Sequence, residues 1–286
     1  MEKHVLSSTK INLFLEVVAK RSDGYHDLET VFQELDLADD IYLTVGEGSG
    51  IRIESDSAEV PLDSSNLAYR AAQEFFEAAG IQASLKVKIV KKIPVAAGLG
   101  GGSSNAAAVL RALLEWFQPS LTPDKIHQVA RSLGADVPFF LRGKTALGRG
   151  IGDILEPIER RLDFYVVLIN PRFKLLTPEV YRALSSDLTR VHTGINLVKA
   201  ALESGSLGDL ASGLFNRLEE VALNRFEELM GFKKWVQSLG FKGVLLSGSG
   251  PTMYCLVQGK AEAKDLRGRI DDWCRGLWWT AVARAV

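Results

Sequence analysis

A dense glycine segment at residues 98–104 carries the strongest chemical signal in the chain. It reads Gly-Leu-Gly-Gly-Gly-Ser-Ser and leads directly into an alanine-rich run typical of a helix. Glycine leaves the backbone open to a ligand and permits positive φ angles. The start of a helix adds unpaired N–H groups and the positive end of the helix dipole, which together favour a bound phosphate. We therefore expect a phosphate-binding loop here.

Two common phosphate-binding patterns do not fit this segment. A Walker A loop has the form GxxxxGK[ST], and no lysine follows these glycines. A dinucleotide-binding fingerprint needs a third glycine where Ser103 stands. A turn without a ligand is the remaining alternative, but so many glycines cost conformational entropy unless something requires them. We expect a nucleoside triphosphate, whose phosphoryl transfer needs mainly positioning, a cation and a proton acceptor.

The elements that must position this loop follow from the periodicity of the apolar residues. Alternation predicts strands at 11–17, 41–45, 51–53 and 85–89, and a buried-type apolar run predicts one at 164–169. Further strands are expected at 243–246, 253–257 and 278–286. Capping residues and helical spacing predict helices at 67–79 and 122–134, with others that begin near 177 and 261 and further helical stretches near 195–238. Strands and helices are mixed without strict βαβ alternation, which favours the α+β class.

Further motifs accompany the glycine segment in a fixed order. They are Lys10-Ile-Asn12-Leu-Phe-Leu15, Arg21-Ser-Asp-Gly-Tyr25-His26, Leu133-Gly-Ala-Asp136-Val-Pro138 and Ser247-Gly-Ser-Gly-Pro251. Together with Pro94–Ala107, they resemble the motifs of the GHMP kinases (the galactokinase, homoserine kinase and mevalonate kinase superfamily). Within that superfamily they are most similar to those of the 4-diphosphocytidyl-2-C-methyl-D-erythritol kinases. The resemblance extends from about residue 7 to residue 257, although Ser8-Thr9 stands where that family commonly has Pro-Ala.

The resemblance implies a two-domain GHMP kinase fold. It would combine an N-terminal domain like ribosomal protein S5 domain 2 with a C-terminal α/β sandwich, and the active site would lie in the cleft between them. Pro157 and the charged run Glu159-Arg160-Arg161 separate two patterned blocks. We accordingly predict an N-terminal domain at 1–157, which carries the glycine loop, and a C-terminal domain at 158–286.

The resemblance also implies ATP-dependent phosphorylation of the 2-hydroxyl of the methylerythritol moiety, in the non-mevalonate isoprenoid precursor pathway. Lys10 and Asp136 match the catalytic residues of the family. Asp136 would accept the hydroxyl proton, while Lys10 would orient the hydroxyl and stabilise the developing charge. Taken alone, Asp136 is an ordinary acid at a helix end and Lys10 a lysine at a strand edge. Mg²⁺ is expected with ATP, held by Ser103 or Ser104 and by phosphate oxygens.

Binding residues follow from the same resemblance. Tyr25 and His26 match the cytidine-binding segment, and Tyr181 occupies the position of a second stacking aromatic ring. Both tyrosines have an alternative role as half-buried packing residues. Asn66 matches a position near the nucleotide base, although a plain helix N-cap is an equally good role for it. The expected ATP-binding residues are Asn66, Pro94, Val95, Ala96, Ala97, Gly98, Leu99, Gly100, Gly101, Gly102, Ser103 and Ser104; the expected substrate-binding residues are Asn12, Tyr25, His26, Asp153, Tyr181, Gly248, Ser249 and Gly250.

Two other functions are compatible with this pattern. One is another small-molecule kinase of the same superfamily, of the homoserine or mevalonate type. The segment Asp23-Gly-Tyr-His26 argues against it, because the resemblance assigns that segment to a cytidine site. The other is a catalytically inactive nucleotide-binding regulator, which the presence of both Lys10 and Asp136 disfavours.

Composition limits the partners. The 34 Lys and Arg residues nearly balance 35 Asp and Glu residues, so no basic excess favours a nucleic acid. No stretch approaches about 18 consecutive apolar residues, which disfavours a membrane protein. Two cysteines without a CxxC motif and four scattered histidines, His192 among them, disfavour a metal centre built by the protein. We expect a cytoplasmic enzyme that binds a cytidine diphosphate substrate and ATP, while its oligomeric state stays open.

Overall fold

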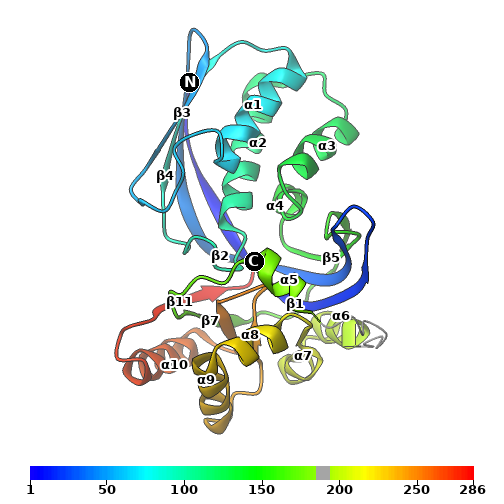
Figure 1. Cartoon of the computed structure of the whole chain (residues 1–286), viewed down its shortest axis with the longest axis vertical. Helices are drawn as coiled ribbons and strands as arrows, with labels where there is room; N and C mark the ends of the chain where they lie inside the picture. Colours follow the sequence, from blue (N-terminus) through cyan, green and yellow to red (C-terminus); the bar gives the residue numbers. More distant parts are fainter. Residues whose placement is uncertain (185–193) are drawn as a thin grey trace. The chain divides into compact units, whose positions relative to one another are not determined.

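The computed structural model describes residues 1–184 and 194–286, so His192 lies outside the described residues. The chain forms two compact units that are each discontinuous in sequence (Figure 1). Unit 1 consists of Met1–Thr9, Leu37–Val95 and Gly100–Gly143; unit 2 consists of Lys10–Asp36, Ala96–Leu99 and Lys144–Val286. Two long strands, β1 (Glu2–Lys20) and β2 (His26–Gly46), contribute one part to each unit.

In unit 1, the sheet is amphipathic. Strand β4 (Ser84–Val90) pairs with β2 on one side and with β3 (Gly50–Ser55) on the other. Along β4, Leu85, Val87 and Ile89 are buried, whereas Lys86 and Lys88 are exposed. Because side chains alternate across a strand, one face of the sheet is apolar and must be covered.

Helices α1 (Leu67–Ala79) and α2 (Gly101–Phe117) lie on that face in unit 1 (Figure 1). Two further helices, α3 (Pro123–Leu133) and α4 (Val137–Arg142), pack against α1, α2 and each other. The facing sides of α1 and α2 are rich in buried alanines, so the two helices pack closely. The start of α2 therefore has a defined position beside the sheet, and α2 is the helix that follows the glycine segment.

In unit 2, the remaining part of β1 pairs in parallel with the short strand β8 (Phe215–Asn216). The corresponding part of β2 pairs with β5 (Thr145–Arg149), which forms a hairpin with β6 (Ile154–Pro157). Residues Lys10–Val17 of β1 are all buried, so both faces of this part of the strand are covered. The apolar residues that predicted the strand at 11–17 lie on only one of these faces. The polar side chains on the other face are the first indication of a site.

A second sheet of unit 2 is entirely antiparallel, in the order β11-β7-β10-β9. Its strands are β7 (Tyr165–Asn170), β9 (Val244–Leu246), β10 (Met253–Val257) and β11 (Trp279–Arg284). The helices of this unit are α5 (Thr177–Arg182), α6 (Gly194–Ser204), α7 (Leu207–Gly213), α8 (Glu219–Arg225), α9 (Glu227–Ser238) and α10 (Lys260–Trp273). Apolar residues of the sheet, α8, α9 and α10 form one core.

The expected α+β class is confirmed, and so are the long elements and their caps. Asn66 caps α1, Thr122 caps α3, and Gly80 ends α1 in the left-handed region. The short elements α4, β5, β6 and β8 are not among the predicted ones, and β8 interrupts the helical stretch expected near 195–238. The single domain boundary near residue 157 stays a prediction. In the part of the chain that the structure describes, no helix has the length and apolarity needed to cross a bilayer.

An aromatic cluster stabilises the core of unit 2, and it shows that Trp278 is a packing residue. The ring of Phe232 on α9 is fully buried and lies 5.5 Å from the ring centroids of both Trp273 and Trp278. We expect Phe232→Ala to lower the free energy of unfolding by about 3–5 kcal/mol, because it removes buried surface and leaves a cavity. Denaturant unfolding followed by tryptophan fluorescence measures this loss.

Leu197→Ala on α6 is the control for this substitution, because the Leu197 side chain is 58% exposed. Its effect should stay within about 0.5 kcal/mol. A loss below about 1 kcal/mol for Phe232→Ala would show that the cluster contributes little to the core.

Candidate active site

A directional chain of hydrogen bonds fixes the polar face of β1 in unit 2. The Lys10 ammonium donates to Asn12 Oδ1 at 2.8 Å, and Asn12 Nδ2 donates to Thr30 Oγ1 at 2.8 Å. The Thr30 hydroxyl in turn donates to the Phe14 carbonyl at 2.6 Å. Because Thr30 accepts from the Asn12 amide nitrogen, the Asn12 oxygen must face Lys10. The spacing of Lys10 and Asn12 on one strand face thus brings the two side chains together.

Lys10 is a buried cation, with only 4% of the residue exposed. Its ammonium lies 5.3 Å from the centroid of the Phe32 ring, within the range of a cation–π interaction. Phe32 also packs against the β5–β6 turn, since a Cβ on Gly152 would lie 3.4 Å from its ring. Asp153 follows in that turn, is 3% exposed, and accepts from the Ile151 N–H. Asp153 therefore lies in the turn that packs against Phe32, the residue whose ring faces Lys10.

The two glycine loops meet in unit 2. Ser247 Oγ donates to the Gly98 carbonyl at 3.0 Å, and the Lys10 N–H donates to the Leu99 carbonyl at 3.2 Å. Gly98 has a φ of +76°, and a Cβ there would lie 2.2 Å from the Ser247 carbonyl oxygen. Only glycine fits such a contact. Residues 96–99 are thus held between β1 and the Ser247–Pro251 loop.

The second half of the glycine segment forms the N-terminus of α2 in unit 1. Gly100 precedes the helix in the left-handed region, and the Ser104 N–H makes the first helical bond, to the Gly100 carbonyl at 2.9 Å. The N–H groups of residues 101–103 therefore precede the intrahelical bonding pattern and point out of the helix end. Such groups suit a phosphate ligand.

Buried side chains hold this helix start from within unit 1. Ser104 Oγ accepts from the Ser7 hydroxyl, and Asn105 Nδ2 donates to Ser7 Oγ and to the Asp39 carboxylate. Asp39 is fully buried, pairs with Lys91 at 2.5 Å and accepts from the backbone N–H groups of residues 92 and 93. One carboxylate thus joins α2 to the segment that enters the glycine loop at Pro94. The Ser104 hydroxyl oxygen has a protein partner, whereas Ser103 is only half-buried.

Asp136 occupies the N-cap position of α4 in unit 1, but its side chain makes no capping hydrogen bond. The preceding turn is tight, because the Val137 N–H donates to the Gly134 carbonyl at 3.1 Å. A Cβ on Gly134 would lie 3.8 Å from Ser103 Oγ. Asp136 is therefore close in structure to the start of α2, two residues after the glycine that faces Ser103.

The aromatic residues expected at a cytidine site occur in unit 2. The rings of His26 and Tyr181 lie 5.0 Å apart, which joins the start of β2 to α5. Tyr25 is 60% exposed and follows a turn in which its N–H donates to Asp23. Burial, and secondarily the charge of Lys20, lowers the pKa of His26 below its ordinary value. His26 is therefore neutral at pH 7, and its ring can both donate and accept a hydrogen bond.

Asn66 acts as a helix cap. Its Oδ1 accepts from the Ala68 N–H at 2.8 Å, and its Nδ2 donates to the Pro61 carbonyl at 2.7 Å. The capping role that the sequence left open is therefore present, and the contact with a nucleotide base stays a prediction.

Comparison with known proteins identifies the family of this chain. Residues 66–144 match the GHMP kinases N-terminal domain and residues 198–276 match the GHMP kinases C-terminal domain. A 4-diphosphocytidyl-2-C-methyl-D-erythritol kinase from Pelotomaculum thermopropionicum is 39% identical over 264 residues, covering 92% of each chain. One of the same name from Alkaliphilus metalliredigens is 41% identical and covers 90% of this chain and 89% of its own. The chain belongs to this family of GHMP kinases.

Solved structures agree with the sequence comparison. A crystal structure of 4-(cytidine 5'-diphospho)-2C-methyl-D-erythritol kinase has a TM-score of 0.80 and 35% identity, and the match covers 99% of this chain and 100% of that one. A homoserine kinase from Cytophaga hutchinsonii has a TM-score of 0.75 at 18% identity, covering 98% and 95% of the two chains. The second match shows the fold alone.

This GHMP kinase contains site residues that no sequence motif indicated. Thr30 and Phe32 lie next to Asn12 and Lys10 in unit 2, and Asp39 supports the glycine segment in unit 1. The only signal for Thr30 and Phe32 is their position two residues apart on a strand, which places them on one face. Asp39 carries no signal, because its partners are distant in sequence.

We expect Gly98→Ala to lower kcat/KM for ATP by about 100-fold, because a misplacement of about 1 Å has this effect on positioned groups. The new Cβ would meet the Ser247 carbonyl and force residues 96–99 away from β1. Steady-state kinetics at saturating acceptor concentration measures the change.

Gly48→Ala is the matched control for this substitution. Gly48 also has a positive φ, of +91°, but a Cβ there would meet nothing within 4 Å. It tests backbone strain without a steric clash, and its kcat/KM should stay within about twofold of the wild type. Equal losses in both variants would contradict the importance of the contact between the two glycine loops.

Proposed function

We propose that this chain transfers the γ-phosphoryl group of ATP to the 2-hydroxyl of 4-diphosphocytidyl-2-C-methyl-D-erythritol. The observation that carries the proposal is the meeting of Lys10, residues 96–99 and the Ser247–Pro251 loop in one unit. A cation and two backbone loops at one place are what phosphoryl transfer requires, since it depends mainly on positioning and on neutralised charge. The substrate follows from the name of the relatives that are 39% and 41% identical.

The chemistry is an exchange of oxygen–phosphorus bonds. The acceptor oxygen forms a bond to the γ-phosphorus as the bond to the departing ADP oxygen breaks, and the hydroxyl proton passes to the Asp136 carboxylate. Lys10 orients the acceptor oxygen and stabilises the charge that develops on the phosphoryl group. The rigid orientation of Asn12 supports this role, because it holds the lysine ammonium in place.

The cytidine end is assigned to the aromatic residues. Tyr25 is exposed and available for stacking, Tyr181 lies against His26, and neutral His26 can read the polar edge of a base. Gly248, Ser249 and Gly250 would contribute backbone groups to the substrate phosphates, with Asp153 near the acceptor.

Mg²⁺ would neutralise phosphate charge in this reaction. The described residues include no cluster of three or more His, Cys, Asp or Glu side chains. The half-buried Ser103 hydroxyl at the helix start, together with phosphate oxygens, fits the oxygen ligands that Mg²⁺ prefers. We also infer a cytoplasmic location, supported by free Cys255 and Cys274, which suit a reducing compartment.

An ATP-consumption assay tests the proposed function. We expect turnover with 4-diphosphocytidyl-2-C-methyl-D-erythritol and none above background with homoserine, mevalonate or galactose. Cytidine nucleotides should raise the melting temperature, because ligands that bind only the folded state stabilise it. Turnover with homoserine or mevalonate would favour another GHMP kinase, and ATP binding without turnover of any acceptor would favour an inactive regulator.

We expect Asp136→Asn to lower kcat by at least about 100-fold, the scale of losing an acid–base group, while ATP binding persists. Asp124→Asn is the control, because Asp124 is an exposed acid in the first turn of α3. Single-turnover assays with calorimetric ATP titration separate chemistry from binding. Undiminished turnover would remove Asp136 from the mechanism.

A further inference from the structure

Asn216 is a buried side chain behind the Ser247–Pro251 loop, and it lies outside every motif of the sequence. It occupies β8 in unit 2 and is 5% exposed. In the parallel pairing of β8 with β1, Asn216 is the partner of Leu15. The strand that carries Lys10 and Asn12 therefore also determines where Asn216 lies.

The Asn216 amide makes three hydrogen bonds, all to backbone atoms. Nδ2 donates to the Leu246 carbonyl and to the Gly248 carbonyl, both at 2.8 Å. Oδ1 accepts from the Leu218 N–H at 2.9 Å. Because carbonyl oxygens only accept, the nitrogen of the amide must be the atom that faces the loop. Asn216 thus holds one carbonyl at the end of β9 and one carbonyl of the loop in fixed directions.

The direction of a carbonyl determines the direction of the next N–H, because the two groups of a trans peptide point opposite ways. The Leu246 carbonyl points to Asn216, and the following N–H, that of Ser247, donates to the Thr252 carbonyl at 2.9 Å. By the same geometry, the Gly248 carbonyl points to Asn216 and the Ser249 N–H points away from it. Among the residues that the structure describes, the Ser249 N–H has no protein acceptor.

The peptide that Asn216 holds lies beside the lysine. A Cβ on Gly248 would be 3.5 Å from Lys10 Nζ, 3.4 Å from Asn12 Oδ1 and 3.3 Å from the Gly98 carbonyl oxygen. The Gly248–Ser249 peptide therefore borders both Lys10 and the first glycine loop. A change in its direction would alter the donors next to the reacting groups.

We propose that Asn216 is a positioning residue for phosphoryl transfer. It fixes the Gly248–Ser249 peptide so that the Ser249 N–H donates to a phosphate oxygen of the reacting group beside Lys10. This inference rests on the proposed function and deepens it. The donor is a backbone group, the Ser249 N–H. Its direction is set by the side chain of Asn216, which does not itself touch the substrate.

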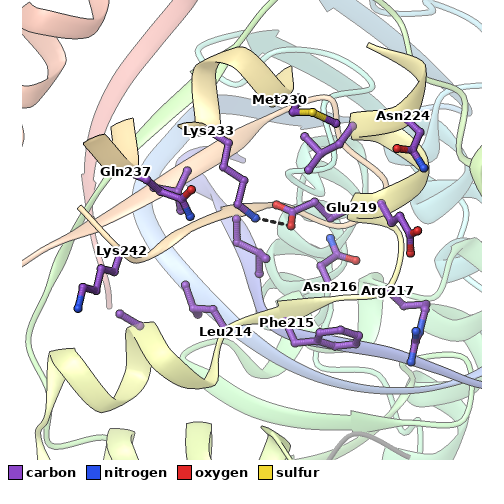
Figure 2. A pocket seen from close by; sticks show the side chains of 15 residues that line it. Leu214, Phe215, Asn216, Arg217, Glu219, Asn224, Met230, Lys233, Gln237 and Lys242 are labelled. Atoms are coloured by element: carbon purple, nitrogen blue, oxygen red, sulfur yellow. Dashed lines mark hydrogen bonds and ion pairs between the residues drawn. The ribbon is translucent and has the colours of Figure 1, made fainter. Parts of the chain in front are cut away.

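A cavity of about 450 Å³ has Asn216, Glu219 and Lys233 in its wall (Figure 2). Glu219 accepts from the Leu246 N–H at 3.0 Å and pairs with Lys233 at 2.5 Å. When Asn216 is truncated, water from this cavity can solvate the two carbonyls. The Ser247–Pro251 loop can then stay folded while the direction of the Gly248–Ser249 peptide is no longer fixed.

The test compares Asn216→Ala, Asn216→Ser and Asn216→Asp with the wild type in the ATP-consumption assay, at 15 °C and with folding checked by circular dichroism. We expect kcat to fall by about 10- to 100-fold, the scale of a lost or misplaced donor to transition-state charge. KM for ATP and for the cytidine substrate should change less than threefold, because the interaction strengthens only as charge develops.

Two controls separate positioning from stability. Asn224→Ala alters an exposed side chain of the same cavity and should leave kcat unchanged. Val236→Ala truncates a fully buried core residue of unit 2, so its melting temperature should fall as that of Asn216→Ala does, with kcat retained.

Each outcome of these experiments either supports or overturns the role assigned to Asn216. Folded Asn216 variants with wild-type kcat, a loss of kcat equal to that of Val236→Ala, or failure of all three variants to fold at 15 °C would overturn the assignment. Absence of wild-type turnover with the cytidine substrate would contradict the proposed function instead. In that case the same variants are tested with whichever acceptor the wild type phosphorylates.

Discussion

The backbone contact between the two glycine loops in unit 2 is the constraint on which the site depends. A Cβ on Gly98 would lie 2.2 Å from the Ser247 carbonyl, so neither loop can move closer and no side chain can separate them. The Lys10 N–H bonds to the Leu99 carbonyl and adds β1 to the same contact. Three chain segments are thus held by their own peptide groups. Gly248 of the second loop then lies beside the Lys10 ammonium, because a Cβ on Gly248 would be 3.5 Å from Lys10 Nζ.

Burial of Lys10 explains why its neighbours are so strongly organised. Moving an ammonium out of water costs several kcal/mol unless other groups replace the water. The Asn12 oxygen and the face of the Phe32 ring provide part of that replacement. Thr30 prevents the Asn12 amide from turning its nitrogen to the lysine, which would place two donors together. The stability of the buried charge and the geometry of the site therefore depend on the same hydrogen bonds.

Periodicity and capping predicted the long elements, because those signals are local. Strand β4 alternates buried and exposed residues, and α1 is bounded by Asn66 and Gly80. The glycine density at residues 98–104 also identified a loop that the structure places at a helix start. Thr30, Asp39 and Asn216 had no comparable signal. Their roles arise from pairing between segments far apart in sequence, and β8, with only two residues, is too short to show a period.

A protein with a net charge of −1 can still bind anionic ligands if peptide N–H groups, and not an excess of basic side chains, contact the anion. Lys91 pairs with Asp39 and Arg217 with Glu16, so much of the positive charge of these cations is balanced inside the protein. Peptide N–H groups carry fixed partial charges that do not titrate, and they add nothing to the net charge. Whether such an N–H group faces a ligand depends on the orientation of its peptide, which the surrounding side chains must fix. Asn216 binds the Leu246 and Gly248 carbonyls, and Asp39 binds the N–H groups of residues 92 and 93, which lead into the glycine segment. A substitution at either position changes how peptide groups are oriented without removing any of those groups.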